Sequence, residues 1–294
     1  MLVVSHENFA SLMQDFNGML IDKSLHGKSL HRTYLIDLNA PEGDEDNERP
    51  AVVKCFGPRS GRFNVFLRNV GNFFTGRTGV GTWRRFKTER RAINVWHQFG
   101  FGAFNVIYEL PEQFKDKPWL VTEFADGIKL DQFLADQSVG QARKDQVMTK
   151  FWEQTAKRHR LALQSRKRIL IPANPNLKHV MLMPEGELLT FDFEVAFVRF
   201  ASVKTLIGRE LTGYVRSMRN FLNTEQFNHS LKVMVQAYPE PNFLNYVKRV
   251  DKSINPVIRA CQVACKFFGP KDRGDKLNAA KIVIKTKKEV LQCK

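Results

Sequence analysis

The sequence has few of the features that mark secreted, metal-stapled or membrane-spanning proteins. It has 4 Cys in 294 residues, too few and too dispersed for a disulfide framework. No other cysteine pair or nearby histidine completes a zinc-ligand set around Cys261 and Cys265. No window approaches the roughly 18 uninterrupted apolar residues of a membrane span, and acidic residues follow the N-terminus too early for a signal peptide. We therefore expect a cytoplasmic protein whose contact with any membrane is peripheral.

Acidic side chains are scarce where basic ones are dense. The chain has 46 Lys plus Arg against 30 Asp plus Glu, a formal net charge of +16. Residues 51–100 contain ten Lys or Arg and a single acid, Glu89. Within them, arginines are interleaved with aromatic residues over 57–82, the basic aromatic segment, which we expect to face an anionic and partly apolar surface. The arginines expected to contact that surface include Arg62, Arg68 and Arg77.

The apolar content excludes global disorder. Hydrophobic residues make up 43% of the chain and Phe alone contributes 24, enough to bury a core. The length suits one large domain or two apposed lobes, and no internal repeat indicates a solenoid or propeller. Charge alone would also suit nucleic-acid binding, but no base-stacking module or groove-reading motif accompanies it. Nucleic acid is therefore not an expected partner.

Apolar periodicity predicts a β-rich beginning and a mostly helical remainder. Strand-like runs occupy 18–25, 29–38, 49–56, 106–110 and 118–124. The first three are expected to form an antiparallel meander, and a helix is expected over 82–99, ended by Gly100. From Lys129 onward the pattern predicts helices, interrupted by two short strands around the turn at 184–186. The basic stretch at 265–294 fits either an amphipathic element or a solvated lysine-rich helix.

Several sequence signals follow one another in an informative order. Lys54 lies in the strand-like AVVKCF, Glu89 in the predicted helix, and Glu123 in the strand-like LVTEF. The stretch ANPNLKHVML, 173–182, then precedes Asp192-Phe193-Glu194. Each signal alone is weak, because a strand lysine or a helix glutamate is usually solvated. Their order and spacing carry the information.

This order resembles the protein-kinase-like superfamily, and within it the bacterial lipopolysaccharide-core sugar kinases that act on Kdo and heptose. Those kinases have an arginine-rich insertion after the lysine strand, a loop of the type His-Ala-Asp-Leu-Asn-x-x-Asn-Ile-Leu and a later Asp-Phe-Asp. Here the loop reads Pro-Ala-Asn-Pro-Asn-Leu-Lys-His-Val-Met over 172–181, so its motifs are degraded. The resemblance spans roughly 20–197. Choline-kinase-like and aminoglycoside-phosphotransferase-like proteins have a catalytic loop of the same type.

The resemblance implies an α+β, bilobal protein-kinase-like fold. Residues 1–124 would form a small β-rich N-lobe, an antiparallel sheet plus one helix, with the basic aromatic segment as an insertion at 57–82. Residues 125–294 would form a larger, mostly helical C-lobe. That lobe would contain a catalytic-like loop at 171–181 and a metal-motif-like segment at 191–194.

The resemblance also implies ATP and Mg²⁺ as cofactors and gives roles to four residues. Lys54 would hold the nucleotide phosphates and act in catalysis, and Glu89 would orient Lys54. Glu123 would contribute to cofactor binding. Asp192 would carry the metal ion, because phosphoryl transfer spreads negative charge that a positioned ammonium and metal-bound carboxylates stabilise.

Two positions depart from the family pattern. The catalytic Asp falls on Asn174, which cannot accept a hydroxyl proton as a carboxylate does, and the metal-binding Asn falls on His179, although imidazole is a poor Mg²⁺ ligand. Base catalysis contributes about 10²–10⁴-fold, so its loss slows transfer without abolishing it.

Two hypotheses therefore stay open. One is ATP-dependent phosphoryl transfer to a sugar hydroxyl of a lipid-linked acceptor, in a weak or lost form. The other is a pseudokinase that binds an anionic lipid, a glycolipid or a partner protein without catalysis. Both place the protein in the cytoplasm at the surface of the inner membrane, with an anionic glycolipid or the membrane itself as partner.

Overall fold

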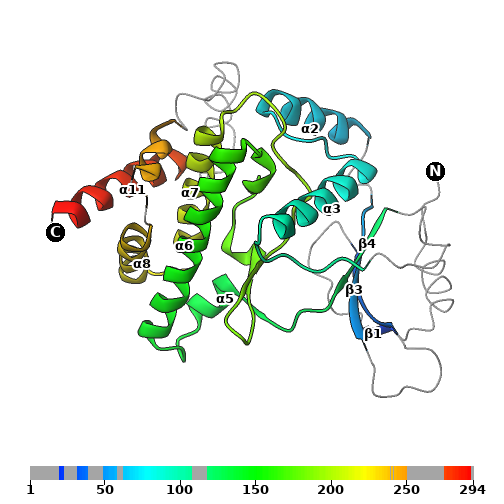
Figure 1. Cartoon of the computed structure of the whole chain (residues 1–294), viewed down its shortest axis with the longest axis horizontal. Helices are drawn as coiled ribbons and strands as arrows, with labels where there is room; N and C mark the ends of the chain where they lie inside the picture. Colours follow the sequence, from blue (N-terminus) through cyan, green and yellow to red (C-terminus); the bar gives the residue numbers. More distant parts are fainter. Residues whose placement is uncertain are drawn as a thin grey trace.

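The computed structural model describes residues 20–22, 32–38, 49–57, 62–107, 118–238, 240, 242–249 and 275–292. The chain is a mixed α+β protein, as the sequence predicts, with a four-stranded sheet on one side and most of the helices on the other (Figure 1). Among the described helices, none is both long and apolar enough to cross a bilayer. The cysteines Cys261 and Cys265 lie outside the described residues.

The larger sheet has four antiparallel strands in the order β1-β2-β3-β4. They are β1 (Leu20–Asp22), β2 (Arg32–Leu38), β3 (Arg49–Cys55) and β4 (Trp119–Glu123). The predicted meander of three runs is thus confirmed, with a shorter first strand. Of the run expected over 106–110, the described part forms only an isolated bridge between Val106 and Thr122.

Strand β3 places Lys54 on the side of the sheet that α3 (Thr82–Gln98) covers. Successive side chains of a strand point to opposite faces, so Lys54 points away from the face on which Ala51 and Val53 are buried, and its Nζ donates to Glu89 of α3 at 2.8 Å. Lys54 pairs in the ladder with Thr33 of β2 and Leu120 of β4. A lysine in a central strand therefore points toward a helix rather than into bulk solvent.

Helix α3 confirms the prediction for 82–99, and Gly100 follows it with a φ of 73°. Its buried side includes Glu89, Ala92, Ile93 and Trp96, which recur at the three- and four-residue spacing of one helix face. One of the four is charged, and a buried carboxylate needs partners. The partners of Glu89 form the candidate site described below.

Helix α2 (Arg62–Thr75) corrects the expectation of a single helix in this part of the chain. The many arginine and phenylalanine residues of this segment indicate a surface segment. Because the two types are interleaved, the helical spacing of the apolar side chains is not evident from the sequence. The helix ends before Gly76, whose φ of 72° is a conformation that favours glycine. A Cβ there would also lie 2.0 Å from the carbonyl oxygen of Arg199, so only glycine allows this close approach.

The remainder of the chain is mostly helical, as predicted. Its described α-helices are α5 (Leu130–Ala135), α6 (Gln141–Ser165), α7 (Val203–Arg219), α8 (Thr224–Ala237) and α11 (Asp275–Gln292). The 3₁₀ helices are η1 (Arg168–Leu170), η2 (Leu177–His179) and η3 (Phe243–Lys248). A small antiparallel sheet contains β5 (Ile128–Lys129), β6 (Val180–Leu182) and β7 (Leu188–Thr190). The loop between η1 and η2 contains the catalytic-like residues.

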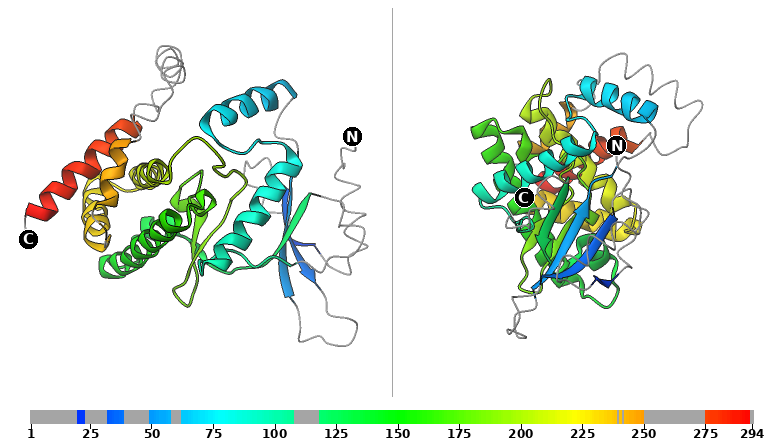
Figure 2. Two further views of the ribbon diagram at one scale, coloured as in Figure 1. Left: turned by 45° about the horizontal axis from the view of Figure 1, so that its top comes forward. Right: turned by 90° about the vertical axis from the view of Figure 1, so that its right-hand side faces the viewer.

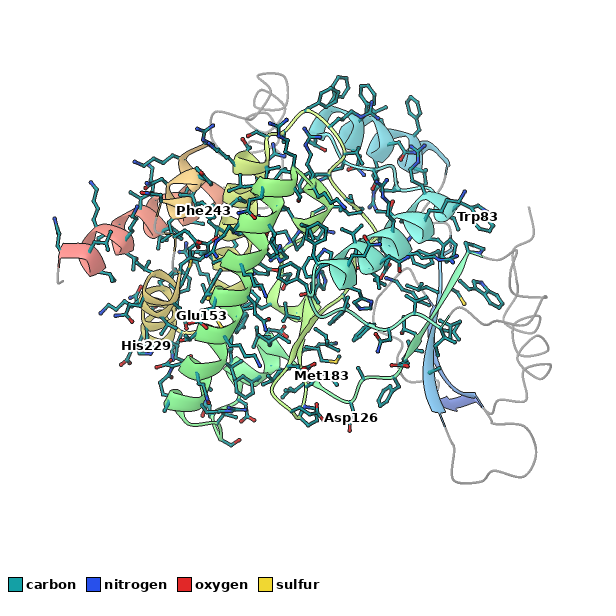
Figure 3. All side chains as sticks on the ribbon, viewed as in Figure 1. Trp83, Asp126, Glu153, Met183, His229 and Phe243 are labelled. Carbon is teal, nitrogen blue, oxygen red and sulfur yellow. The ribbon has the colours of Figure 1, made fainter. Side chains whose placement is uncertain are left out.

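One continuous apolar core joins the sheet to the helices. Phe56 and Leu120 from the sheet side, Trp96 on α3, Trp152 on α6 and Leu206 on α7 all belong to it. Figures 1 and 2 show α3 between the larger sheet and the other helices, and Figure 3 shows side chains filling this region. Each large apolar side chain buried here contributes about 1.5–3 kcal/mol. This core fixes the position of α3 relative to the loop that follows β7.

Candidate functional site

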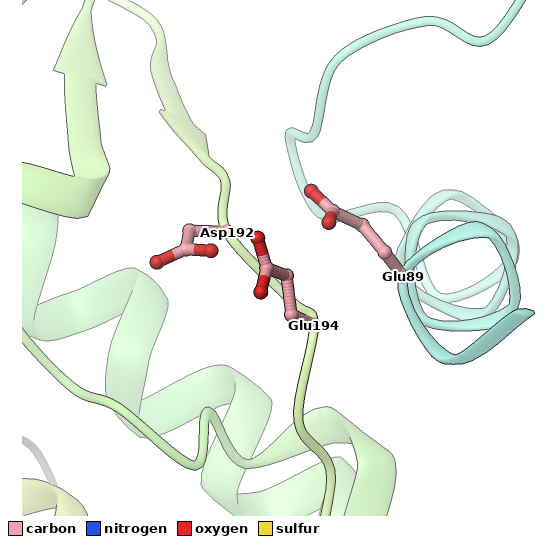
Figure 4. A group of neighbouring side chains, drawn as sticks. All are labelled: Glu89, Asp192 and Glu194. Carbon is pink, nitrogen blue, oxygen red and sulfur yellow. The ribbon is translucent and has the colours of Figure 1, made fainter. Parts of the chain in front are cut away.

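Lys54 lies at the centre of a cluster of three carboxylates. Its Nζ is 2.8 Å from Glu89 Oε2, 2.9 Å from Glu194 Oε1 and 3.6 Å from Asp192 Oδ1. The carboxylates come from α3 and from the loop after β7, and they face one another in Figure 4. Residues separated by more than a hundred positions in sequence therefore meet at one strand lysine. The structure brings together Lys54, Glu89 and Asp192, which the sequence analysis singled out.

Glu194 and Arg85 complete the cluster and were not among the predicted site residues. Arg85 Nη1 is 3.3 Å from Glu194 Oε2, and its Nε donates to the carbonyl oxygen of Val80 at 3.0 Å. Both side chains are buried. Arg85 precedes Glu89 by four residues and so lies on the same face of α3, which is the signal in the sequence that would have identified it. Glu194 is thus held by two cations.

Asp192 is the most exposed acid of the cluster. Its side chain is 29% exposed, against 5% for Glu89 and 3% for Glu194. Its φ of 68° is unusual for a residue other than glycine, and such backbone outliers gather at functional sites. The next residue, Phe193, is buried with its ring centroid 4.7 Å from that of Trp96. Phe193 therefore anchors the loop and leaves the Asp192 carboxylate accessible.

His179 lies on the other side of Asp192. Its Nε2 is 3.3 Å from Asp192 Oδ2, and its Nδ1 is 3.2 Å from the main-chain carbonyl oxygen of Asn174. Because a carbonyl oxygen only accepts hydrogen bonds, Nδ1 is assigned as the protonated nitrogen. In the neutral ring Nε2 then presents a lone pair to a carboxylate oxygen. Two acceptors at this distance need a proton or a cation between them.

Burial and charge together set the protonation states in the cluster. Burial acts to lower the pKa of Lys54, but Glu89, Glu194 and Asp192 outweigh it and raise that pKa, so the ammonium stays charged. Burial raises the pKa of Glu89 to about 7, although Lys54 opposes the rise. Burial also lowers the pKa of His179 against the opposing effect of Asp192, which favours the neutral imidazole at pH 7.

The catalytic-like loop is held in place by contacts with α7. Asn176 Oδ1 accepts a hydrogen bond from Ser217 Oγ at 2.8 Å, and Ser217 Oγ accepts one from the Leu177 N–H at 3.0 Å. A Cβ at Gly213 of α7 would lie 2.3 Å from Pro175 Cγ, so the missing side chain leaves room for the loop. Asn174 itself is exposed. Its side chain is therefore available to a substrate.

Arg77 does not belong to an open surface, contrary to the expectation for the basic aromatic segment. It is only partly exposed, and its Nη2 donates to the carbonyl oxygen of Ala173 at 3.1 Å. Burial lowers the pKa of Arg77, and the nearby charge of Arg209 lowers it further. Two guanidinium groups thus give positive charge to the region beside Asn174. Arg62 was also expected at that surface, and its side chain is not among those that the structure describes.

Glu123 lies outside the cluster. It is the exposed last residue of β4, and Asn105 Nδ2 donates to its Oε2 at 2.8 Å. In the strand ladder it pairs with Ala51, whereas Lys54 pairs with Leu120. In the described structure Glu123 therefore does not contact Lys54. Its role in cofactor binding stays a prediction.

The residues that could hold a divalent cation lie at one edge of the cluster. Oxygen atoms of Glu89, Asp192 and Glu194 lie within 4.8 Å of one another, and carboxylate oxygens are the ligands that Mg²⁺ prefers. Lys54 already contacts all three, so the remaining ligand atom is Asp192 Oδ2, which faces His179. A carboxylate with an imidazole suits Mn²⁺ better than Mg²⁺, because imidazole is a softer donor.

Comparisons with known proteins give no family. No protein-family model matches the chain, and no curated protein matches it.

Proposed function

We propose that this protein is a kinase-like phosphotransferase. It would bind ATP with a divalent cation and transfer a phosphoryl group to a sugar hydroxyl of a lipid-linked acceptor, within a bilobal fold whose small lobe contains the four-stranded sheet and α3. The observation that carries the proposal is the ion pair between Lys54 and Glu89 at 2.8 Å. In kinase-like enzymes a strand lysine held by a helix glutamate contacts the nucleotide phosphates.

The roles of the residues follow from their chemistry. The Lys54 ammonium attracts phosphate oxygens, and Glu89 and Glu194 keep it oriented. Asp192 and His179 would hold the divalent cation, which when bound neutralises charge on the transferring phosphoryl group. Asn174 would form a hydrogen bond with the acceptor hydroxyl but would not remove its proton. The acceptor oxygen would form the new bond to the γ-phosphorus while the bond to the β-phosphate breaks to leave ADP, and the hydroxyl proton would pass to solvent. We therefore expect slow turnover, reduced by about 10²–10⁴-fold relative to a site with a carboxylate base.

The charge beside the catalytic-like loop supports an anionic acceptor. Arg77 and Arg209 lie close enough for their charges to interact, and Arg77 contacts Ala173, the neighbour of Asn174. A phosphate or carboxylate on the acceptor would suit a site beside these guanidinium groups, since arginine forms strong paired hydrogen bonds with both groups.

Nucleotide binding is the decisive test. We expect ATP with Mg²⁺ or Mn²⁺ to raise the melting temperature of the wild-type protein, and Lys54→Met to abolish the shift because the phosphates lose their cation. Lys157→Met, at an exposed position of α6, is the matched control and should behave as wild type. A nucleotide-induced shift that survives in Lys54→Met, or its absence from the wild type, would contradict the proposal.

A pseudokinase is the second candidate, and the exposed Asn174 favours it. Among the described residues, no carboxylate is seen to contact Asn174, so the position lacks a visible base. The double variant Asn174→Asp with His179→Asn restores the family pattern. Phosphoryl transfer to a lipopolysaccharide-core acceptor that appears only in this variant would show that the natural protein binds nucleotide without useful catalysis. Measurable transfer by the wild type would exclude this candidate.

A further inference from the structure

Helix α2 has its apolar face toward solvent. The exposed apolar side chains are Phe66 at 62%, Leu67 at 50%, Val70 at 37%, Phe73 at 48% and Phe74 at 55%. These positions recur at intervals of three and four residues, which places them along one side of a helix. Ring side chains extend outward from this blue helix in Figure 3. In an ordinary surface helix that side would be buried.

The polar side of α2 faces the protein instead. Asn69 Oδ1 accepts a hydrogen bond from the Val80 N–H at 2.7 Å, and Asn72 Nδ2 donates to the carbonyl oxygen of Thr78 at 2.8 Å. Both asparagines are partly buried. The hydrogen bonds join α2 to the loop that leads into α3. The orientation of the helix is therefore fixed by specific contacts, and its apolar side is left outside.

A second segment enlarges the apolar surface. Phe200, 68% exposed, has its ring centroid 6.0 Å from that of Phe73, and the Arg199 guanidinium lies 4.5 Å from the Phe73 ring centroid. The main chain of this segment is held to the end of α2, since Gly76 accepts a hydrogen bond from the Val198 N–H at 2.8 Å. The exposed apolar residues of α2 and Phe200 form one patch, called here the α2 patch.

The described charged residues within the α2 patch are basic. Residues 51–88 contain no Asp or Glu in the sequence, and Arg68 on α2 is exposed. Arg199 adds a second cation beside the rings. Aromatic and aliphatic side chains that project from a helix with basic neighbours match the boundary of an anionic bilayer, where rings enter the acyl region and arginines contact phosphates.

We propose that the α2 patch is the surface by which this protein docks on an anionic lipid membrane, with Phe66 and Phe74 inserted and Arg68 at the headgroups. A second copy of the chain is a poorer occupant, because pairing two such patches would bring Arg68 and Arg199 of one copy close to the same arginines of the other. The docking does not depend on phosphoryl transfer. It would, however, bring the loop that contains Asn174 to the surface on which a lipid-linked acceptor lies, through the contact of Arg77 with Ala173.

Vesicle co-sedimentation tests the proposal. The wild-type protein should bind phosphatidylglycerol vesicles and bind phosphatidylcholine vesicles much less. Phe66→Ser with Phe74→Ser should weaken phosphatidylglycerol binding by at least about tenfold, since each large apolar side chain withdrawn from water contributes about a factor of ten. Arg68→Ala should weaken it about fivefold and reduce its dependence on salt.

Matched controls separate this surface from general stickiness and from the nucleotide site. Leu291→Ser and Ile128→Ser remove exposed apolar side chains elsewhere, on α11 and β5, and should bind vesicles as the wild type does. Lys54→Met should also bind normally, whereas the double Phe variant should keep its ATP-induced thermal shift. Equal binding by the double Phe variant would overturn the proposal. The proposal would also be overturned if the wild-type protein were a dimer in sedimentation velocity and did not bind vesicles, while the double Phe variant was a monomer.

Discussion

Two charged clusters in this molecule are built from similar groups but differ in how completely they are enclosed. In the first, between α6 and α7, Glu210 accepts hydrogen bonds from Arg158 on both oxygens and lies 2.8 Å from His159 Nε2. Arg158 Nη1 also donates to the carbonyl oxygen of Leu170 at 2.7 Å, and His159 Nδ1 contacts the Tyr238 hydroxyl. All of these side chains are buried.

The second cluster, around Lys54, is open to solvent on one side. Among the described residues it brings the carboxyl groups of Glu89, Asp192 and Glu194 together with the cations Lys54 and Arg85. Asp192 is 29% exposed. A closed cluster fixes the relative positions of helices, and its groups are all engaged within the protein. An open cluster leaves part of its carboxyl groups in contact with solvent, and such clusters of titratable groups with shifted pKa values are frequent at functional sites.

The largest effect expected from breaking the closed cluster is on stability. Glu210→Gln leaves Arg158 buried without its counter-charge, and such a loss costs about 3–5 kcal/mol of unfolding free energy. Urea denaturation measures this cost. Glu153→Gln, at an exposed position of α6, the helix that contains Arg158 (Figure 3), serves as control and should change the free energy by less than about 0.5 kcal/mol. Equal effects of the two substitutions would mean that the buried network is not required for the fold.

The pH dependence of stability should separate the clusters, because the pKa values of their carboxyl groups shift in opposite directions. Burial raises the pKa of Glu89 from 4.5 to about 7. Its contribution to stability is then complete below pH 4.5 and is lost as the pH rises through 7. Burial also acts to raise the pKa of Glu210, but Arg158 and His159 outweigh it and lower that pKa. The contribution of Glu210 is therefore present above its unfolded pKa and is lost as the pH falls through its folded pKa.

Denaturation between pH 4.5 and 7.5 is the corresponding measurement. In the wild type we expect the free energy of unfolding to include a decline on the order of 1–3 kcal/mol over this range from Glu89. Glu89→Gln should remove that decline, whereas the decline should persist in Glu210→Gln. If Glu89→Gln leaves the pH profile unchanged, the open cluster does not hold a carboxyl group with a raised pKa.

The local pattern of the sequence predicts the elements of the open cluster well. The alternation in AVVKCF places Lys54 on a strand, the spacing within 82–99 places Glu89 on a helix, and the turn at 184–186 separates two short strands that lead to Asp192. These signals are local, so a single sequence carries them. The mixed α+β class follows from the same periodicities.

The contact of Lys54 with Glu89 is expected from the family resemblance, but other contacts between distant segments do not follow from local patterns. Arg85 meets Glu194 across 109 positions, and Arg77 meets Ala173 across 96. The exposure of the apolar face of α2 is not predicted from the sequence either, because a sequence does not distinguish an exposed phenylalanine from a buried one. The sequence predicts Arg77 at the membrane surface, but tertiary packing directs its side chain to the catalytic-like loop. Composition identified the character of the basic aromatic segment but not its orientation.

The smallest effect expected concerns the choice of metal ion, and only the open cluster should respond. Because His179 Nε2 faces Asp192 Oδ2 at 3.3 Å, Mn²⁺ should stabilise the ATP-bound protein at lower concentration than Mg²⁺ does. His179→Asn replaces the imidazole with an amide oxygen and should reverse the preference by about tenfold in apparent affinity. Titration of each ion followed by thermal shift measures this. His159→Asn, in the closed cluster, should destabilise the protein without changing the ratio of the apparent affinities for Mn²⁺ and Mg²⁺. If His159→Asn changed that ratio as much as His179→Asn does, the two clusters would not differ in their response to metal ions.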